Sequence, residues 1–105
     1  MAPDHIAEVQ TLCSGAKAMA EGEFEYLFLP SLTLPCGDIV DALLCPVQHS
    51  GYTTRLFLSK QVAGRGQNWN SFTILGRTWW TPSFNNVLAT LRPIQILDAH
   101  LQLYR

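Results

Sequence analysis

Charged residues are scarce in this chain of 105 residues. Asp, Glu, Lys and Arg make up 14% of it, with seven basic and eight acidic side chains and a formal net charge of −1. Ordinary soluble domains contain about 25% charged residues. Seven scattered basic residues form no basic stripe, so the composition argues against a nucleic-acid-binding protein. The hydrophobic content of 48% excludes a disordered chain, which needs high net charge and low hydrophobicity.

Long apolar runs and paired cysteines are also missing. No run approaches the ~20 apolar residues of a membrane-spanning helix, so we expect no membrane insertion. Residues 1–5 lack a basic region followed by an apolar segment, and we therefore expect no secretory signal. Cys13, Cys36 and Cys45 are odd in number and have no repeated spacing. They are typical of reduced thiols in a cytoplasmic protein rather than of a disulfide framework.

The sequence predicts neither a metal site nor a bound cofactor. Cys36, Cys45 and His49 could be three zinc ligands, but no C-x-x-C pair and no fourth ligand accompany them. Gly64 and Gly66 lack the third glycine, the lysine and the strand-to-helix context of a phosphate-binding loop. Cys45 falls inside an apolar strand, where cysteine acts as a small hydrophobic residue. Cys36 is in a turn and is the one weak candidate for a nucleophile.

Hydrophobic spacing predicts a single α+β domain over residues 1–105. A first helix is expected over residues 4–20, closed by Gly22. The expected strands cover residues 24–30, 39–45, 52–59 and 72–75. A last helix begins at Pro93 and carries an apolar stripe of Ile94, Leu97, Leu101 and Tyr104. This order predicts a sandwich in which helices pack on an antiparallel meander of about four strands.

Adjacent tryptophans stand out in the stretch that follows the last expected strand, for which we expect an irregular conformation. Trp79 and Trp80 would point to opposite faces of an extended segment, so one indole enters the core. The other lies under a loop or contacts a partner. Arg77 shares the face of Trp79 if the segment is extended. Arg77, Trp79 and Trp80 are therefore the candidate partner-binding residues.

Four short motifs follow one another in an order typical of a known family. They are Leu34-Pro35-Cys36-Gly37-Asp38 before Ile39-Val40-Asp41, the pair Gly51-Tyr52, the segment Leu75-Gly76-Arg77-Thr78-Trp79, and Leu91-Arg92-Pro93 at the start of the last helix. Together they resemble a bacterial family of the ubiquitin-conjugating-enzyme-like (UBC-like) superfamily, of the prokaryotic family E type. Its matching motifs are a Leu-Pro-x-Gly turn, Gly-Tyr-Pro, Leu-Gly-Arg-x-Trp and Trp-Arg-Pro. Thr53 stands where the family has the proline of Gly-Tyr-Pro. The resemblance covers residues 32–105.

The resemblance implies a UBC-like sandwich and a role in ubiquitin-like conjugation. Members of the family are associated with ubiquitin-like proteins, an adenylating activating enzyme and a JAB-type isopeptidase, in gene sets connected with defence against phage. A conjugating enzyme carries its active cysteine after the fourth strand, close to a His-Pro-Asn-type motif. Residues 76–93 of this chain contain neither cysteine nor histidine, and offer Arg77, Thr78, two tryptophans, Asn85 and Asn86 instead.

These departures lead us to expect a non-catalytic subunit. It would bind a ubiquitin-like protein or a catalytic conjugating partner, with the activating enzyme as a further candidate partner. Two alternatives stay open at this point. The chain could be an active conjugating enzyme with Cys36 as a relocated nucleophile, or an unrelated small α+β binding module.

Overall fold

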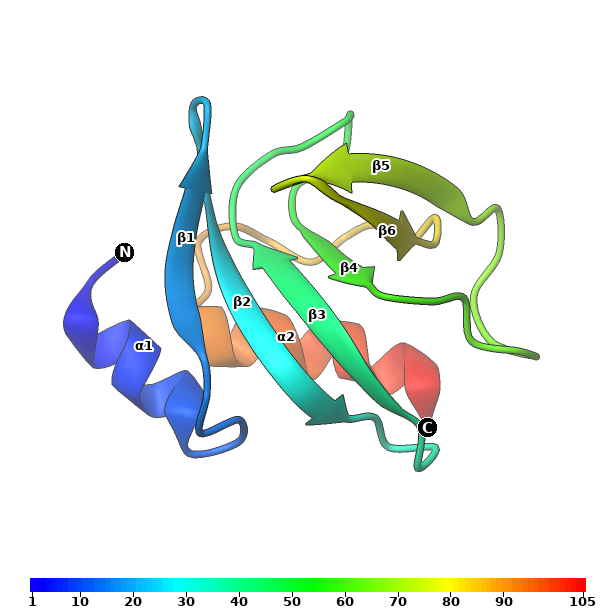
Figure 1. Cartoon of the computed structure of the whole chain (residues 1–105), viewed down its shortest axis with the longest axis horizontal. Coiled ribbons are helices and arrows are strands. Elements are labelled where there is room, and N and C mark those ends of the chain that lie inside the picture. The colour runs from blue at the N-terminus through cyan, green and yellow to red at the C-terminus, as the bar shows by residue number, and fades with distance from the viewer.

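Six antiparallel strands form one curled sheet, and two helices contribute to the core beneath it (Figure 1). The computed structural model describes residues 1–105. The elements are α1 (Pro3–Gln10), β1 (Lys17–Glu21), β2 (Phe24–Thr33), β3 (Ile39–Cys45), β4 (Arg55–Leu58), β5 (Asn70–Ile74), β6 (Arg77–Thr81), α2 (Pro93–Leu101) and a 3₁₀ turn, η1 (Gln102–Tyr104). The strands lie in the order β1-β2-β3-β4-β6-β5. The α+β class is confirmed, whereas the expected number of about four strands is wrong.

The predicted helix over residues 4–20 is wrong beyond Gln10. Val9, Cys13 and Ala16 are all buried, but the helix ends at Gln10, before Cys13 and Ala16. The backbone turns so closely at Gly15 that a Cβ atom there would lie 2.7 Å from Cγ of Pro30. Residues 17–21 then pair with β2 over five register positions, so strand pairing replaces the last helical turns.

Strand β6 occupies the stretch that was expected to be irregular. Leu75 and Gly76 both have positive φ angles, of 54° and 73°, and join β5 to β6 as a two-residue hairpin with Ile74 opposite Arg77. A positive φ at both central residues is the geometry of a tight hairpin turn. Leucine is rare in that conformation, and the turn was therefore not predicted from the sequence.

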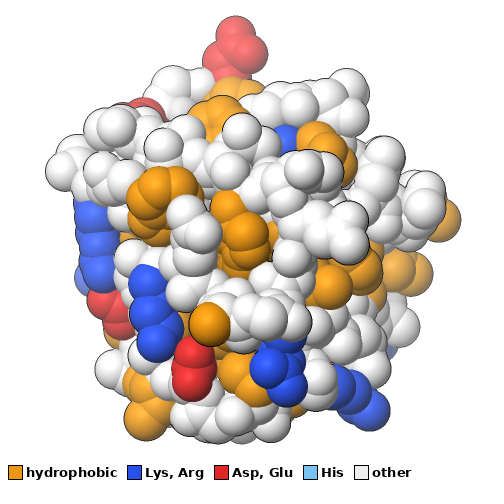
Figure 2. Space-filling model, turned by 90° about the vertical axis from the view of Figure 1, so that its right-hand side faces the viewer, with side chains coloured by type: hydrophobic (Ala, Val, Ile, Leu, Met, Phe, Trp, Pro, Cys, Tyr) orange, Lys and Arg blue, Asp and Glu red, His pale blue; other side chains and the backbone are white.

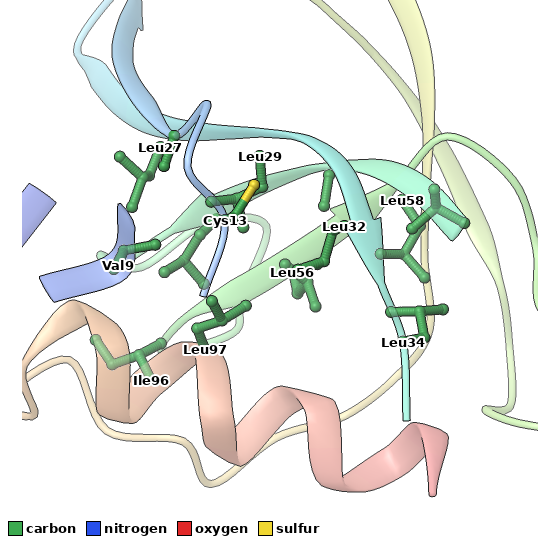
Figure 3. Packing of buried hydrophobic residues seen from close by; sticks show 14 of the residues in the cluster. Val9, Cys13, Leu27, Leu29, Leu32, Leu34, Leu56, Leu58, Ile96 and Leu97 are labelled. Carbon is green, nitrogen blue, oxygen red and sulfur yellow. The ribbon is translucent and has the colours of Figure 1, made fainter. Parts of the chain in front are cut away.

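The main core lies between the sheet and the helices (Figure 3). It joins Val9 from the first helix and Ile96 and Leu97 from the last to leucines of β2 and β4. Residues Pro93, Ile96, Leu97, His100 and Tyr104 are the buried positions of α2 and η1. The predicted stripe therefore needs a correction, because Ile94 and Leu101 are only half-buried. The true stripe is rotated toward Ile96 and His100, within the width that an amphipathic helix buries.

A second core covers the other face of the sheet. It consists of Tyr26, Leu43, Cys45, Phe57, Ile74 and Trp79, with Phe24, Phe28, Phe72 and Leu75 packed against it. The β5–β6 hairpin curls over this face, and the Glu21 carboxylate accepts a hydrogen bond from the Leu75 N–H at 3.1 Å. The sheet is thus nearly closed on itself. Strand β3 lies between both cores, which explains why residues 42–45 are apolar without alternation.

The remaining expected strands match the structure in position. The strand predicted over residues 39–45 coincides with β3, and the one over 24–30 extends to Thr33. The strand predicted over 52–59 contains the shorter β4, and β5 overlaps the one expected over 72–75. Neither helix is long and apolar enough to cross a membrane.

Candidate partner-binding site

Strand β6 carries all three candidate partner-binding residues. The Trp79 side chain is buried in the second core, with 2% of its surface exposed, and its Nε1–H donates to the Ile74 carbonyl at 3.0 Å. Alternation along the strand directs Trp80 to the opposite face, where it is half-buried. Trp79 therefore contributes chiefly to folding. Trp80 and Arg77 are the two that keep solvent-accessible surface.

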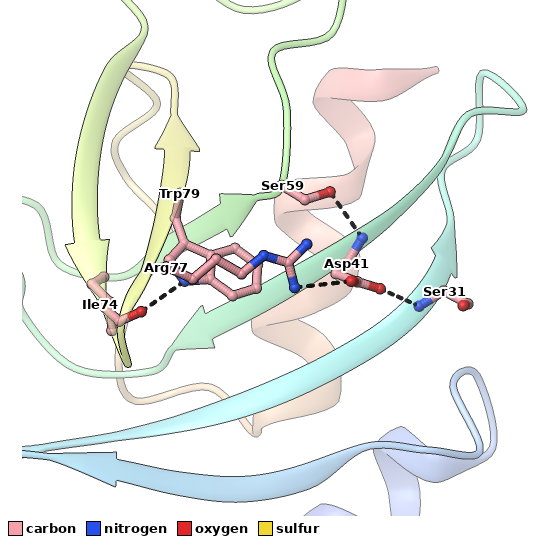
Figure 4. Close-up of polar contacts among 6 residues, drawn as sticks. All are labelled: Ser31, Asp41, Ser59, Ile74, Arg77 and Trp79. Carbon is pink, nitrogen blue, oxygen red and sulfur yellow. Dashed lines mark hydrogen bonds and ion pairs between the residues drawn. The ribbon is translucent and has the colours of Figure 1, made fainter.

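Arg77 is held in one orientation by two contacts (Figure 4). Its guanidinium carbon lies 4.7 Å from the centre of the Trp79 ring, and its Nη1 donates to Oδ2 of Asp41 at 3.0 Å. The other carboxylate oxygen of Asp41 accepts the Ser31 N–H at 2.9 Å. The Ser31 hydrogen bond lowers the pKa of Asp41, and the Arg77 hydrogen bond and charge add to this effect. The anionic carboxylate thus fixes the arginine at the surface.

A recess of about 180 Å³ opens beside Arg77. Its lining residues are Lys17, Met19, Phe28, Leu75, Arg77 and Trp79. The Lys17 ammonium lies 5.8 Å above the Phe28 ring, and the Phe28 and Trp79 rings meet edge to face with centroids 6.3 Å apart. Sequence reasoning did not identify Lys17 or Phe28 as site residues, because residues 4–20 were expected to form a helix.

A wider and more open recess of about 530 Å³ lies at the other end of β1 and β2. It is formed by the first residues of the chain, the segment before α2 and the stretch after β3, with Glu23 and Glu25 at its side. The Met1 ammonium forms an ion pair with Glu25 there. Elsewhere the surface is sparsely charged. On the face seen in Figure 2, hydrophobic side chains form separate patches between backbone and other side chains, and most of the Lys and Arg lie in its lower half beside acidic side chains.

The three cysteines differ in exposure: Cys13 and Cys45 are buried, whereas Cys36 is partly exposed. The Cys13 thiol contacts the Pro30 carbonyl at 3.2 Å and the Cys45 thiol contacts the Val47 carbonyl at 3.4 Å. Burial raises the pKa of both thiols, so neither is a ready nucleophile. Cys36 is partly exposed in the β2–β3 turn and packs against the main core. No three His, Cys, Asp or Glu side chains come together in a metal-binding group.

Two buried polar groups were missed at the sequence level. The His100 Nε2 lies 2.8 Å from the Thr54 hydroxyl, which itself donates to the Val87 carbonyl at 2.9 Å. The Thr53 hydroxyl donates to the same carbonyl at 2.7 Å. These bonds attach the segment before α2 to the start of β4. The His100 ring, which the sequence places beside the apolar stripe of the last helix, is buried.

Arg55 is the second of these groups. Its side chain is 4% exposed, its guanidinium lies 3.9 Å from the Tyr52 ring centre, and its Nε donates to the His49 carbonyl at 3.4 Å. Its Nη1 is buried and has no hydrogen-bond partner. No pattern in the sequence indicated that an arginine at the start of a strand would be buried.

No protein-family model, curated protein or solved structure matches this chain. The function is therefore inferred from the residues of the chain and from the geometry described above.

Proposed function

We propose that the chain is a non-catalytic subunit with a UBC-like fold, acting in a bacterial ubiquitin-like conjugation pathway that serves antiphage defence. It binds a ubiquitin-like protein or a catalytic conjugating partner, and the candidate contact residues are Arg77 and Trp80, which lie on opposite faces of β6. The proposal combines the family resemblance of residues 32–105 with the order of the elements and the distribution of the thiols.

The order of the elements supports the UBC-like part of the proposal. Helix α1 precedes four consecutive antiparallel strands that are neighbours in the sheet, and α2 packs on the same core as α1. The Leu-Pro-x-Gly motif lies in the β2–β3 turn, where the Gly37 N–H donates to the Leu34 carbonyl at 2.9 Å and Gly37 has a φ of 97°. The β5–β6 hairpin is an addition between the meander and the last helix.

The observation that carries the non-catalytic assignment is the absence of a thiol between β4 and α2. Residues 59–92 contain no cysteine and no histidine. Transfer through a thioester needs a thiolate at the reacting position. The thiols of this chain follow α1, occupy the β2–β3 turn and end β3, and the two buried ones have raised pKa values. The segment that would carry the thioester in a conjugating enzyme supplies aromatic, amide and arginine side chains instead.

One observation keeps an active enzyme as the second candidate. Cys36 is partly exposed and lies in the same turn as the family-like motif. Against it stands the packing of Cys36 on the main core near Tyr104, whose pKa is raised chiefly by burial and further by the Cys36 charge. No basic side chain is hydrogen-bonded to its sulfur. Thioester formation measured on cysteine variants of the chain distinguishes the two candidates.

Co-purification tests the binding role. The tagged chain is co-expressed with the ubiquitin-like protein and the conjugating enzyme encoded by neighbouring genes, and captured material is measured for the wild type, Trp79→Ala and Trp80→Ala. We expect Trp79→Ala to unfold the protein, because it empties the second core. Trp80→Ala should stay folded and bind its partner about tenfold more weakly, since 1.4 kcal/mol is a factor of ten. Failure of the wild type to capture either protein would favour an unrelated binding module.

A further inference from the structure

The recess beside Arg77 has a composition that differs from the rest of the surface. Met19, Phe28, Leu75 and Trp79 supply its apolar walls, and the charged groups that line it are both cations, Lys17 and Arg77. Its residues come from β1, β2, the β5–β6 turn and β6, so the curling of the sheet creates it. Because the Glu21 carboxylate holds the Leu75 amide, the far wall is fixed to β1.

The volume of the recess indicates what kind of ligand it can hold. Sites for small molecules usually measure about 300–1,000 Å³. A recess of about 180 Å³ is too small for a cofactor and suits one large side chain of a protein partner. The half-buried Met19, Phe28 and Leu75 can contact such a side chain, whereas Trp79 is only 2% exposed. Aromatic rings meet favourably in edge-to-face and offset arrangements, which favours an aromatic or leucine side chain as the occupant.

The charges on the rim of the recess indicate which groups of the partner lie next to the inserted side chain. Lys17 forms no ion pair in the structure, and Arg77 uses only Nη1 toward Asp41. The Arg77 side chain is 46% exposed, so its other nitrogens can meet a second carboxylate. Asp41 and Glu21 lie nearby, but neither lines the recess, and each already accepts a hydrogen bond from a main-chain N–H. The rim therefore complements carboxylates.

We propose that this recess binds an acidic peptide segment of a partner protein, with one aromatic or leucine side chain inserted against Met19, Phe28 and Leu75. Carboxylates on either side of the inserted residue pair with Lys17 and Arg77. This proposal rests on the binding role inferred above and specifies the segment that the partner contributes.

Peptide titration followed by NMR tests the proposal on the full chain. The probe is a capped peptide of the order Asp-Glu-Phe-Glu-Asp, raised to millimolar concentration. We expect it to shift the resonances of Lys17, Phe28 and Leu75 and the Trp79 indole. Replacing the peptide's Phe by Ala should weaken binding about tenfold, and added salt should weaken it further because rim charges are screened. The charge-reversed peptide Lys-Lys-Phe-Lys-Lys should leave these resonances unchanged.

Lys17→Glu and Lys60→Glu form a matched pair of variants. Both are exposed lysines that end as glutamates, but Lys60 pairs with Asp38 and lies outside the recess. We expect Lys17→Glu to weaken binding of the acidic peptide about tenfold and Lys60→Glu to leave it unchanged. Equal effects of the two variants, equal shifts by the charge-reversed peptide, or no shift at millimolar peptide would overturn the proposal. Capture of the ubiquitin-like protein despite such a result would leave the binding role intact.

Discussion

At the scale of single residues, the buried His100 connects folding to pH. Burial lowers its pKa from 6.5 to about 4, and the nearby Arg55 charge acts in the same direction. The Thr54 hydroxyl donates its proton to the Val87 carbonyl, so it accepts from the neutral His100 Nε2–H. Protonation of the ring would bury a charge beside Arg55 without a carboxylate to compensate it.

Stability should therefore fall as the pH is lowered from 6.5 toward 4. In this window the unfolded chain binds a proton at His100 and the folded chain does not, so the stability that is complete above pH 6.5 is progressively lost. A difference of 6.5 − 4 in pKa corresponds to about 3 kcal/mol. Urea denaturation across this range measures the loss. Burial also lowers the pKa of His49, which adds to the effect in the same direction.

The variant His100→Gln should flatten this pH dependence, whereas His5→Gln, placed on α1, should leave it unchanged. An equally steep profile for His100→Gln and the wild type would contradict the role given to His100.

Arg55 is a residue whose charge costs stability in the isolated chain. Its buried Nη1 lacks a partner, and leaving a buried donor unsatisfied costs about 1–3 kcal/mol. Burial also lowers the pKa of the guanidinium. Arg55→Met keeps an extended side chain over Tyr52 and removes the unsatisfied donor. We expect it to leave the free energy of unfolding unchanged or to raise it by about 1 kcal/mol.

The matched variant Arg55→Ala should lower that free energy, because it also removes the packing over Tyr52. Urea denaturation of both variants measures the difference. A clear loss of stability in Arg55→Met relative to the wild type would mean that the charge itself stabilises the fold.

At the scale of elements, α2 stabilises the main core through Ile96 and Leu97. Leu97→Ala should lower the free energy of unfolding by about 2–5 kcal/mol, since Leu97 is fully buried. For a domain of this size, each kcal/mol corresponds to a melting temperature about 4–8 °C lower. Leu101→Ala should cost less, because Leu101 is half-buried. Leu88, which is 56% exposed, is the control, and Leu88→Ala should change stability little. Melting curves that do not distinguish Leu97→Ala from Leu88→Ala would show that α2 is not docked.

Elements with a simple hydrophobic pattern could be predicted from the sequence, whereas β1 could not. Strand β3 and the start of α2 follow from a continuous apolar run and from Pro93 at a helix N-terminus. Strand β1 has exposed residues at four of its five positions, so no alternation marks it. Its sequence, Lys-Ala-Met-Ala-Glu, consists of good helix formers. Pairing with β2 overrides that local preference.

The candidate site was predictable only in part, for a related reason. Arg77, Trp79 and Trp80 were identified because two adjacent indoles cannot share one core. Lys17 and Phe28 complete the recess only because the sheet curls and brings β1 and β2 to the β5–β6 turn. Such curvature depends on contacts between segments far apart in the chain. No local pattern in the sequence encodes it.

At the scale of the whole molecule, two hydrophobic cores on opposite faces of one sheet have different structural roles. The main core docks both helices, and the second core holds the β5–β6 hairpin that presents Arg77 and Trp80. No sulfur lies on the chain between β4 and α2. The central claim of our proposal is that this subunit binds a partner and does not carry a thioester.

The most direct test of that claim is a reconstituted reaction with a cysteine-free chain, Cys13→Ala, Cys36→Ser, Cys45→Ala. The ubiquitin-like protein, its activating enzyme and the catalytic conjugating partner are combined with the wild type or this variant, after calorimetry has verified that the variant is folded. We predict the same partner-dependent conjugates from both, with no reducing-agent-sensitive adduct on this chain. An adduct on the wild type that disappears in folded Cys36→Ser would contradict the claim and identify Cys36 as the nucleophile.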